Sequence, residues 1–376
     1  MKATLRTAAA VSAVALLAAC GSSTSAPNAG SSGGSSSSPS GSSSTAAATG
    51  SKFLGCMVTD TGGIDDRSFN ASSWQGMEEA HTADPSITVK YLQSQTGSDY
   101  TPNINQFISE KCGIIVTVGF LMGGNTQTAA KAHPSQKFAI VDYTYSPAIK
   151  NIDALVFNTV QDAFLGGYLA AGMSKSGAVG TFGGQQLPTV TIYMDGYYDG
   201  VQYYNQQHHT HVKVLGWNEK TQKGLFTGNF TNQTTGQTDT QNLISEGADV
   251  IFPVAGNVGL GAAKAVQDAD ASAGSQKVNM EWVDTDGCIS ATQYCKYFIS
   301  SVTKGIQAAV KAAVLSAAHG TFKGGNYIGD LANDGVVLSP FHQFSTKVPA
   351  ALQSELNTIK QEIISGKIKP ATKSPV

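Results

Sequence analysis

A polar turn near the start of the chain contains the side chains best suited to holding a small ligand. It runs from Asp60 to Trp74 and combines three acids, two glycines, two aromatic residues and an asparagine within fifteen residues. The apolar run Phe53–Val58 precedes it, and a segment with helical spacing follows. The turn therefore lies where a strand of an α/β sheet ends, and there backbone N–H groups and side chains face a crevice. The pattern predicts half of a binding site.

Alternating strand and helix patterns place this turn in a parallel α/β unit. Runs rich in β-branched residues alternate with segments of helical spacing, which is typical of parallel strands with helices between them. The predicted strands are 53–59, 87–92, 113–118, 137–142 and 154–158, and the predicted helices lie near 71–82, 101–110 and 121–132.

A second unit of similar size and order follows the first. Its predicted helices are 160–173, 188–206, 237–246 and 258–269, and its predicted strands are 178–182, 212–216, 249–254 and 278–284. Beyond Asp284 the pattern predicts a long helix over 303–319 and an extended piece over 335–338, a tail long enough to cross between two lobes. The roughly 325 residues from Lys52 onwards exceed what one hydrophobic core usually holds, which favours two domains.

The first residues have the features of an export signal. Lys2 and Arg6 precede an apolar run over 8–17 that is too short to span a bilayer, and Leu-Ala-Ala-Cys20-Gly follows. This arrangement resembles a bacterial lipobox, whose cysteine is lipidated and becomes the mature N-terminus; an ordinary signal peptide with an incidental cysteine is the alternative. We expect a signal peptide over 1–19, a flexible Ser/Gly-rich tether over 20–51, and a lipid-anchored protein at the extracytoplasmic face of the cell membrane.

The charge balance argues against nucleic acid as a partner. Lys2 and Arg6 are two of 24 basic residues, so removing the leader leaves 22 against 26 acidic residues and a net charge of −4. A nucleic-acid binder normally shows a basic stripe, and the sequence contains none. His208, His209 and His211 have no accompanying cysteine or acid cluster, so we predict no metal site and no cofactor.

The cysteines indicate an oxidising compartment. With Cys20 assigned to lipid, four remain, an even number that fits disulfide pairing in an exported chain. Cys288 and Cys295 are close in sequence, while Cys56 and Cys112 lie on runs expected to be neighbouring strands. Of the three possible pairings these two bridges are the preferred prediction, and buried free thiols are the alternative.

Six stretches in a fixed order carry a family resemblance. They are Asp60-x-Gly-Gly-x-Asp-Asp-x-Ser-Phe-Asn70 with Trp74-x-Gly76, Ala163 to Ala171, Phe182-Gly-Gly-x-x-x-Pro188, Gly196-x-x-x-Gly200-Val201, Gly247 to Ile251, and Val283-Asp-x-Asp286. Together they resemble the basic membrane protein (BMP) family of bacterial ABC-transporter substrate-binding lipoproteins, the PnrA-like purine nucleoside receptors. The likeness covers most of 53–345.

The resemblance implies a type I periplasmic-binding fold, in which two doubly wound parallel-sheet lobes are joined by a hinge and enclose the ligand. We expect 52–158 and 288–322 to form lobe 1, and 159–287 and 323–376 to form lobe 2.

The resemblance also implies which residues hold the ligand. Similar proteins sandwich a purine between two aromatic rings, and the matching positions are Phe69 and Phe230. Asp142 falls where the family places an acid at the edge of the base. Asp60, Gly256 and Asp284 fall where it grips the sugar, and Asn70 completes the predicted ligand contacts.

The predicted function is therefore an ABC-importer substrate-binding protein that binds inosine, guanosine or adenosine, passes it to the permease and performs no chemistry. A nucleoside hydrolase is one alternative, because Asp-rich glycine turns after a first strand occur in such enzymes. A hydrolase turn would, however, contain a further Asp between Thr61 and Gly62. A receptor for a sugar or another small solute is the second alternative.

Overall fold

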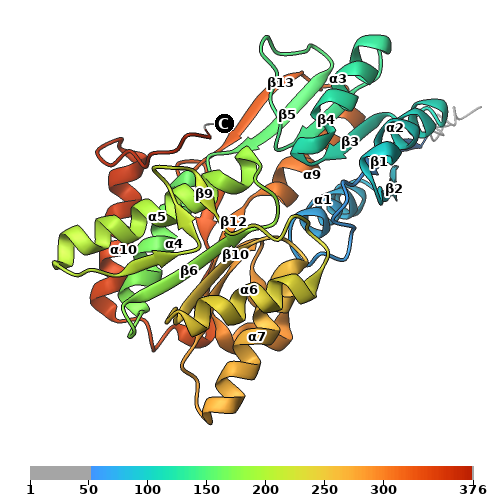
Figure 1. Ribbon diagram of the computed structural model, residues 1–376. Helices are drawn as coiled ribbons and strands as arrows, with labels where there is room; N and C mark the ends of the chain where they lie inside the picture. The colour runs from blue at the N-terminus through green and yellow to red at the C-terminus, as the bar shows by residue number, and fades with distance from the viewer. Residues whose placement is uncertain (1–51, 375–376) are drawn as a thin grey trace, which may run out of the picture. The chain divides into compact units, whose positions relative to one another are not determined.

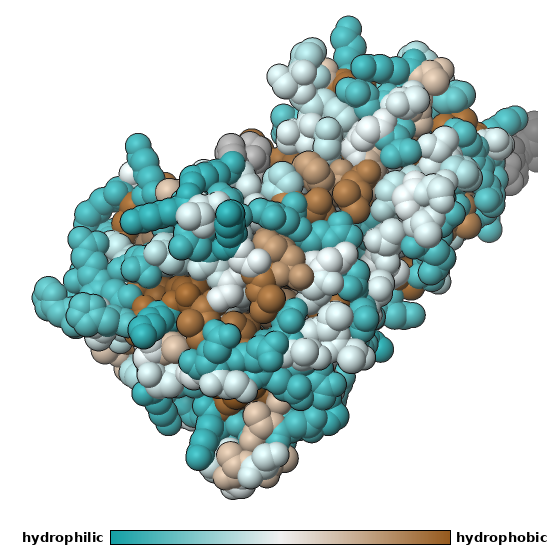
Figure 2. Space-filling view, in the orientation of Figure 1, coloured by the Kyte–Doolittle hydropathy of each residue, from teal (hydrophilic) through white to brown (hydrophobic). Residues whose placement is uncertain are grey.

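The computed structural model of the protein describes residues 52–374, which belong to one compact unit beginning at Gly50. The predicted signal peptide, the predicted lipidation site Cys20 and the predicted tether lie outside the described residues. Within 52–374, no helix combines the length and the apolar character that crossing a membrane requires. Hydrophilic residues cover most of the face seen in Figure 2, and hydrophobic residues form separate patches on it.

Six parallel strands form the first sheet, in the order β13-β5-β4-β3-β1-β2. Their bounds are β1 Phe53–Val58, β2 Ile87–Leu92, β3 Ile114–Val118, β4 Phe138–Val141, β5 Ile152–Phe157 and β13 Gly325–Gly329. The strand β3 has the sequence Ile-Ile-Val-Thr-Val and is buried along its whole length. Such a continuous apolar run is expected for a strand that is covered on both faces.

Six strands also form the second sheet, in the order β14-β12-β11-β10-β6-β7, with β14 antiparallel to its neighbour. Their bounds are β6 Ala178–Gly183, β7 Lys213–Leu215, β10 Val250–Val254, β11 Asn279–Asp284, β12 Phe298–Lys304 and β14 Val336–Leu338. Counted along these orders, β4 and β11 hold the same place in the two sheets. Asp142, which follows β4, and Asp284, which ends β11, therefore occupy matching positions.

Helices cover both faces of each sheet (Figure 1). On the first sheet, α1 (Phe69–Ala83) packs with α9 (Ile306–Ala318), and α2 (Tyr100–Ser109) with α3 (Gly123–Ala132). On the second, α6 (Gln233–Ser245) packs with α7 (Val258–Ala273), and α4 (Val160–Met173) with α5 (Pro188–His208) and α10 (Ala350–Ile364). One hydrophobic core joins the α1/α9 face of the first sheet to the α4/α5 face of the second. The α2/α3 and α6/α7 faces each cover a core of their own.

Helices α4 and α5 approach so closely that glycine is required at their contact. A Cβ on Gly167 would lie 1.9 Å from the carbonyl oxygen of Tyr197, and one on Gly200 would lie 2.0 Å from that of Phe164. Both glycines belong to stretches that carry the family resemblance. At these two positions the motifs therefore specify packing within the second lobe.

The chain crosses between the two sheets three times, after β5, after β12 and after β13. Hydrogen bonds tie the crossing segments to one another. The backbone N–H of Asn158 donates to the Gly329 carbonyl at 2.7 Å, and that of Gly305 donates to the Gly335 carbonyl at 2.8 Å. These three connected crossings form the hinge between the lobes.

The predicted type I architecture is confirmed, but the last quarter of the chain differs from expectation. Residues 298–304 form strand β12, and the helix predicted over 303–319 begins at Ile306. The sequence pattern did not reveal strand β12 because Ser300 and Ser301 interrupt its apolar run. Thr303 is also a residue type that often begins a helix as its N-cap, so the helix was predicted to begin too early. Strand β13 and helix α10 were not predicted.

Sheet membership consequently differs from the predicted lobe boundaries. Within 288–322, which we had placed in lobe 1, strand β12 belongs to the second sheet and only α9 covers the first. Within 323–376, which we had placed in lobe 2, strand β13 pairs with β5 of the first sheet. The unrecognised crossing at Gly305 explains both differences.

Both predicted disulfides are present. Cys56 on β1 is bonded to Cys112, which lies just before β3, with Cα atoms 6.0 Å apart. This geometry follows from the direct parallel pairing of β1 with β3. Cys288 and Cys295 are bonded with Cα atoms 4.5 Å apart and close a short loop. The alternative of buried free thiols is therefore wrong for these four residues.

Candidate functional site

A cleft between the two sheets collects side chains from the ends of their strands, and we call it the ligand cleft. About 560 Å³ of space in this cleft is not filled by atoms, and part of that space is open to solvent. All seven predicted ligand residues line it: Asp60, Phe69, Asn70, Asp142, Phe230, Gly256 and Asp284. Tyr193 and Lys304 are among the further residues that line it and were not predicted.

The turn after β1 fixes Asp60 at the cleft. Its Oδ1 accepts hydrogen bonds from the backbone N–H of Gly62 at 3.1 Å and from Nδ2 of Asn70 at 3.0 Å. Burial raises the pKa of Asp60, while these two hydrogen bonds act in the opposite direction. A Cβ at position 62 would lie 2.7 Å from Nδ2 of Asn70, so glycine allows the turn to close. Asn70 thus orients Asp60 in addition to lining the cleft.

Asp66 caps the helix that carries Phe69. Its carboxylate accepts hydrogen bonds from the backbone N–H groups of Ser68, Asn70 and Ala71, at 3.0, 2.8 and 3.0 Å. Burial raises the pKa of Asp66 to about 7 in spite of these three donors, which lower it. The neighbouring Asp65 is exposed. Asp66 therefore satisfies N–H groups at the start of α1 that have no partner within the helix.

The two predicted aromatic residues reach the cleft from different lobes. Phe69 is the first residue of α1, and Phe230 lies in the loop before α6. The Phe230 ring packs over Gly184, where a Cβ would lie 2.3 Å from Cε1 of the ring. Trp74, at the end of the same motif, contacts Tyr91 edge-on with ring centroids 4.9 Å apart, and it does not line the cleft.

A buried lysine joins the two strand-end aspartates. Lys304, the last residue of β12, donates to Oδ2 of Asp142 at 2.6 Å, and its Nζ lies 3.4 Å from Oδ1 of Asp284. The exposed fraction of its side chain is 3%. Burial disfavours the ammonium, but the two carboxylates outweigh burial and raise the pKa of Lys304. Burial also raises the pKa of Asp142, and Lys304 opposes that rise.

Asp284 receives further donors from both lobes. The Tyr193 hydroxyl donates to Oδ1 at 2.8 Å, and the Ser68 hydroxyl of the first lobe donates to Oδ2 at 2.9 Å. Nε1 of Trp282 donates to the Arg67 carbonyl at 3.1 Å. These contacts fasten the turn after β1 to strand β11 of the second lobe.

Asp142 and Asp284 share an unusual backbone conformation. Their φ angles are 65° and 66°, in the left-handed region that non-glycine residues rarely adopt. Such conformations are unfavourable and recur where a side chain must be aimed at a site. Both strand ends thus direct a carboxylate towards Lys304 and the cleft.

Sequence reasoning missed Lys304, Tyr193 and the inter-lobe role of Ser68. Lys304 ends a strand that the sequence pattern assigned to a helix, and a single lysine has no motif around it. Tyr193 lies on a helix whose sequence gave no sign of which face meets the cleft. Ser68 stood within the motif Asp60 to Asn70, but its partner Asp284 is 216 residues away.

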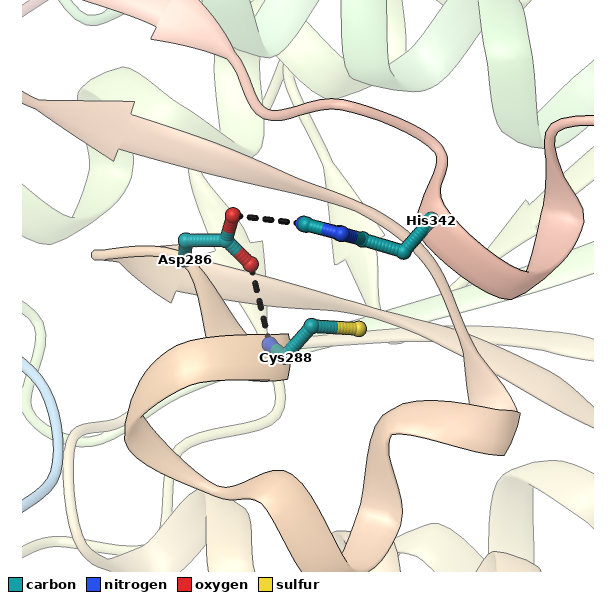
Figure 3. A group of neighbouring side chains, drawn as sticks. All are labelled: Asp286, Cys288 and His342. Atoms are coloured by element: carbon teal, nitrogen blue, oxygen red, sulfur yellow. Dashed lines mark hydrogen bonds and ion pairs between the residues drawn. The ribbon is translucent and has the colours of Figure 1, made fainter.

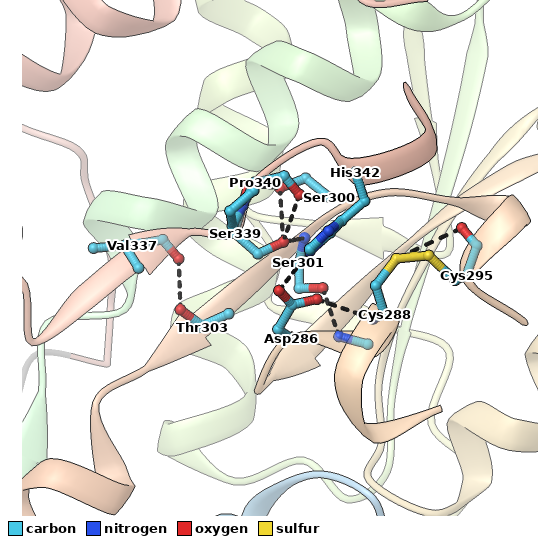
Figure 4. Close-up of polar contacts among 11 residues, drawn as sticks. Asp286, Cys288, Cys295, Ser300, Ser301, Thr303, Val337, Ser339, Pro340 and His342 are labelled. Carbon is cyan, nitrogen blue, oxygen red and sulfur yellow. Dashed lines mark hydrogen bonds and ion pairs between the residues drawn. A yellow bond between two sulfur atoms is a disulfide. The ribbon is translucent and has the colours of Figure 1, made fainter. Parts of the chain in front are cut away.

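A polar cluster lies beside a second groove, which shares Asp284 and Lys304 with the ligand cleft. Nε2 of His342 lies 2.7 Å from Oδ2 of Asp286, and the backbone N–H of Cys288 donates to Oδ1 at 2.9 Å (Figure 3). The three residues converge as metal ligands do. The sulfur of Cys288 is, however, bonded to Cys295 (Figure 4), so it offers no thiolate to a metal.

Two doubly wound lobes, three crossings and a cleft lined from both lobes define a type I solute-binding protein. A solved structure of an ABC transporter solute-binding protein from Aeropyrum pernix K1 is similar, with a TM-score of 0.76 and 25% identity, covering 84% of this chain and 92% of that one. A solute-binding protein from Bacillus halodurans C-125, with bound myo-inositol, shares the fold at a TM-score of 0.55 and 14% identity, covering 79% and 98% of the chains.

Residues 53–373 match the Bmp family, described as ABC transporter substrate-binding protein PnrA-like, and the chain belongs to this family. A similar relative is the ABC transporter nucleoside-binding protein BmpA of Lactococcus lactis, 28% identical over 330 residues, which cover 84% of this chain and 88% of the relative. Basic membrane protein A of Borreliella burgdorferi is 27% identical over 312 residues, 82% of this chain and 84% of the relative. The protein is therefore a substrate-binding protein of an ABC transporter, with a small solute as its ligand and the transporter as its partner.

Proposed function

We propose that the protein is a lipid-anchored, extracytoplasmic receptor that binds a purine nucleoside between Phe69 and Phe230 and delivers it to an ABC permease. One observation carries the proposal. The seven residues selected from the sequence come from five separate segments of both lobes, and all of them line one cleft. The cleft combines aromatic rings with three buried aspartates, which is the combination that a base and a ribose require.

The chemistry of the cleft suits a nucleoside. A base stacked on an aromatic ring is stabilised by about 1–3 kcal/mol, and carboxylates accept hydrogen bonds from ribose hydroxyls and from N–H groups of a purine. A micromolar ligand is held by about 8 kcal/mol, so stacking on two rings would supply roughly a quarter to three-quarters of the binding free energy. Lys304 occupies Oδ2 of Asp142, which leaves Oδ1 to accept from the edge of the base.

The assignment of each residue follows from its surroundings. Asp60 is oriented by Asn70 at the cleft wall, and the left-handed turn at Gly256 brings backbone close to the same space. We assign both to the sugar. Asp284 already accepts from Ser68 and Tyr193, so we assign it a single further contact to a ribose hydroxyl. The name of the Lactococcus lactis relative, a nucleoside-binding protein, supports the ligand class.

Identifying the ligand retained by the purified protein tests the proposal most directly. Mass spectrometry after denaturation should detect inosine, guanosine or adenosine. Added nucleoside at about a hundred times its dissociation constant should raise the free energy of unfolding by ~2.7 kcal/mol, and free ribose should add little. The nucleoside must be recovered unchanged. Accumulation of free base would favour the hydrolase alternative, and stabilisation by a sugar alone would favour the sugar receptor.

Removing one ring tests the stacking. Phe69→Ala should weaken nucleoside binding by about 5- to 150-fold, which corresponds to the loss of one stacking contact. Phe322→Ala is the matched control, because Phe322 is also half-buried but does not line the ligand cleft. Equal affinities of the two variants, measured by calorimetric titration, would contradict the proposed sandwich.

The lipid anchor has its own test. Two related proteins of Pyrococcus species, each 28% identical, are named uncharacterized lipoproteins, which supports anchoring through Cys20. Cys20→Ala should leave the protein either unprocessed or soluble. Immunoblots of membrane and soluble fractions would show this. A processed variant that still partitions with membranes would exclude lipidation of Cys20 as the anchor.

A further inference from the structure

A second space adjoins the ligand cleft at Asp142, and we call it the side chamber. About 430 Å³ of its space is not filled by atoms, and part of that space is open to solvent. Four residues line both spaces, namely Phe120, Asp142, Thr189 and Lys304. A group that reaches Asp142 from the ligand cleft therefore stands at the boundary of the side chamber.

Packing fixes the aromatic wall of the chamber. The Tyr143 ring lies against Phe120, with centroids 5.1 Å apart, and against Tyr145, with centroids 5.0 Å apart. Tyr143 also packs over Gly123, where a Cβ would lie 2.3 Å from Cε2 of the ring. This wall belongs to the first lobe, and Tyr143 is held there by its packing on Gly123 of α3.

The C-terminal tail contributes the facing wall through Ser374. The hydroxyls of Ser374 and Thr191 lie 2.8 Å apart. The carboxylate of Asp195 accepts from the Thr372 hydroxyl at 2.8 Å and from the Lys373 backbone N–H at 3.1 Å. The tail is thus held along α5, and the chamber is bounded by both lobes.

The lining chemistry selects the kind of group that fits. Tyr143, Phe157 and Ile192 supply apolar surface, and Thr144 and Ser374 add hydroxyls. Lys304 is the single basic side chain in the lining, and two carboxylates already engage it. A phosphate would lie beside the carboxylate of Asp142 with no free cation to balance its charge. An aromatic or aliphatic arm would instead contact the apolar side chains of the lining.

We propose that the side chamber accepts a substituent on the exocyclic amine of the bound base, so that the ligand class extends to purine nucleosides with a small apolar or aromatic arm on that amine. This inference rests on the proposed function, which places the edge of the base at Asp142. A singly substituted amine keeps one N–H, which donates to Oδ1 of Asp142 while the arm enters the chamber. The chamber is therefore a specificity-determining extension of the ligand cleft.

The test compares parent and substituted nucleosides on the purified, exported protein by calorimetric titration. The probes are adenosine with N6-benzyladenosine, and guanosine with N2-benzylguanosine, and inosine is titrated in parallel. We expect a benzylated probe to bind the wild type within about three-fold of its parent, or more tightly. N6,N6-Dimethyladenosine, which has no N–H for Asp142, should bind more weakly than the larger N6-benzyladenosine.

Two variants fill the chamber from opposite walls. Thr144→Trp and Ser374→Trp should each weaken the benzylated probe at least about ten-fold relative to its parent nucleoside. Thr128→Trp, at an exposed position on α3, should leave the relative affinity for the benzylated probe and its parent unchanged. Retained binding of the parent nucleoside shows that each variant is folded.

The outcomes separate the two proposals. If parent nucleosides bind the wild type and benzylated ones do not, the side chamber has no such role and the proposed function stands. The proposal would also be refuted if the affinity of the benzylated probe relative to its parent were the same in the wild type and in both tryptophan variants. If no nucleoside binds the wild type, both the proposed function and the proposed role of the side chamber are refuted.

Discussion

Replacing Lys304 by methionine tests whether the ion pair at the hinge holds the lobes as the structure indicates. Lys304→Met keeps the length of the side chain and removes its charge, which leaves the buried carboxylate of Asp142 without its partner. The exposed fractions of the two side chains are 3% and 7%. Removing one partner of a buried pair reduces the free energy of unfolding by about 3–5 kcal/mol, because an uncompensated charge stays buried.

Lys311→Met, on the helix α9 that follows β12, provides the matched control. Lys311 pairs with Glu79 at 3.4 Å, but both side chains are more than a third exposed. Exposed pairs contribute about 0–1 kcal/mol, so this variant should unfold close to the wild type. Urea unfolding of ligand-free protein, followed by tryptophan fluorescence, measures both differences.

The pH dependence of the Lys304→Met deficit follows from the same contact. Lys304 lowers the pKa of Asp142, so its removal raises the folded pKa of that carboxyl further. An acid whose pKa is higher in the folded state gains stability as the pH falls, so the deficit should shrink below neutral pH. Combining Lys304→Met with Asp142→Asn should restore at least about 1 kcal/mol. Additive losses in the double variant, or a deficit equal to that of Lys311→Met, would refute the reasoning.

Three further predictions concern the fold. Replacing Cys56 and Cys112 by alanine removes a link over 56 residues and should lower the free energy of unfolding by about 4 kcal/mol in chemical denaturation; an unchanged midpoint would exclude a stabilising bridge. Gly167→Ala should destabilise the second lobe by several kcal/mol because it collides with the α5 backbone, whereas Gly124→Ala, with open space around it, should gain about 0.5–1 kcal/mol in the same assay. Burial raises the pKa of Asp66 to about 7, so the folded protein binds the extra proton, and the free energy of unfolding should fall as the pH rises from about 4 to about 7. Asp66→Asn should flatten that fall, and an identical pH profile for the variant would contradict the assignment.

Much of the fold follows from local sequence patterns. Runs such as Ile114–Val118 identify buried parallel strands, and the turn after Phe53–Val58 locates one wall of the ligand cleft. The Cys56–Cys112 disulfide followed from the expected neighbours among those strands, and the Cys288–Cys295 disulfide followed from closeness in sequence. In these cases the relevant information lies within one element or in adjacent ones.

The remaining features depend on contacts between residues far apart in the chain. Lys304 meets Asp142 across 162 residues, and nothing near either residue indicates the other. The crossing at Gly305 separates a strand of one lobe from a helix of the other, but its sequence resembles a continuous helical segment. The seven residues selected by the family resemblance line one cleft, whereas Lys304, the cation beside them, was found only from the three-dimensional arrangement.

Two segments far apart in the chain lie on different lobes, and this has a practical consequence for measuring ligand in solution. Strand β1, which follows Lys52, belongs to the first lobe, whereas residues 371–374 lie along α5 of the second. A donor fluorophore at position 52 and an acceptor at position 369 would therefore stand on opposite sides of the hinge. Any rotation of one lobe against the other changes their separation and the efficiency of energy transfer. The receptor can thus be converted into a ratiometric optical sensor without interrupting any strand or helix.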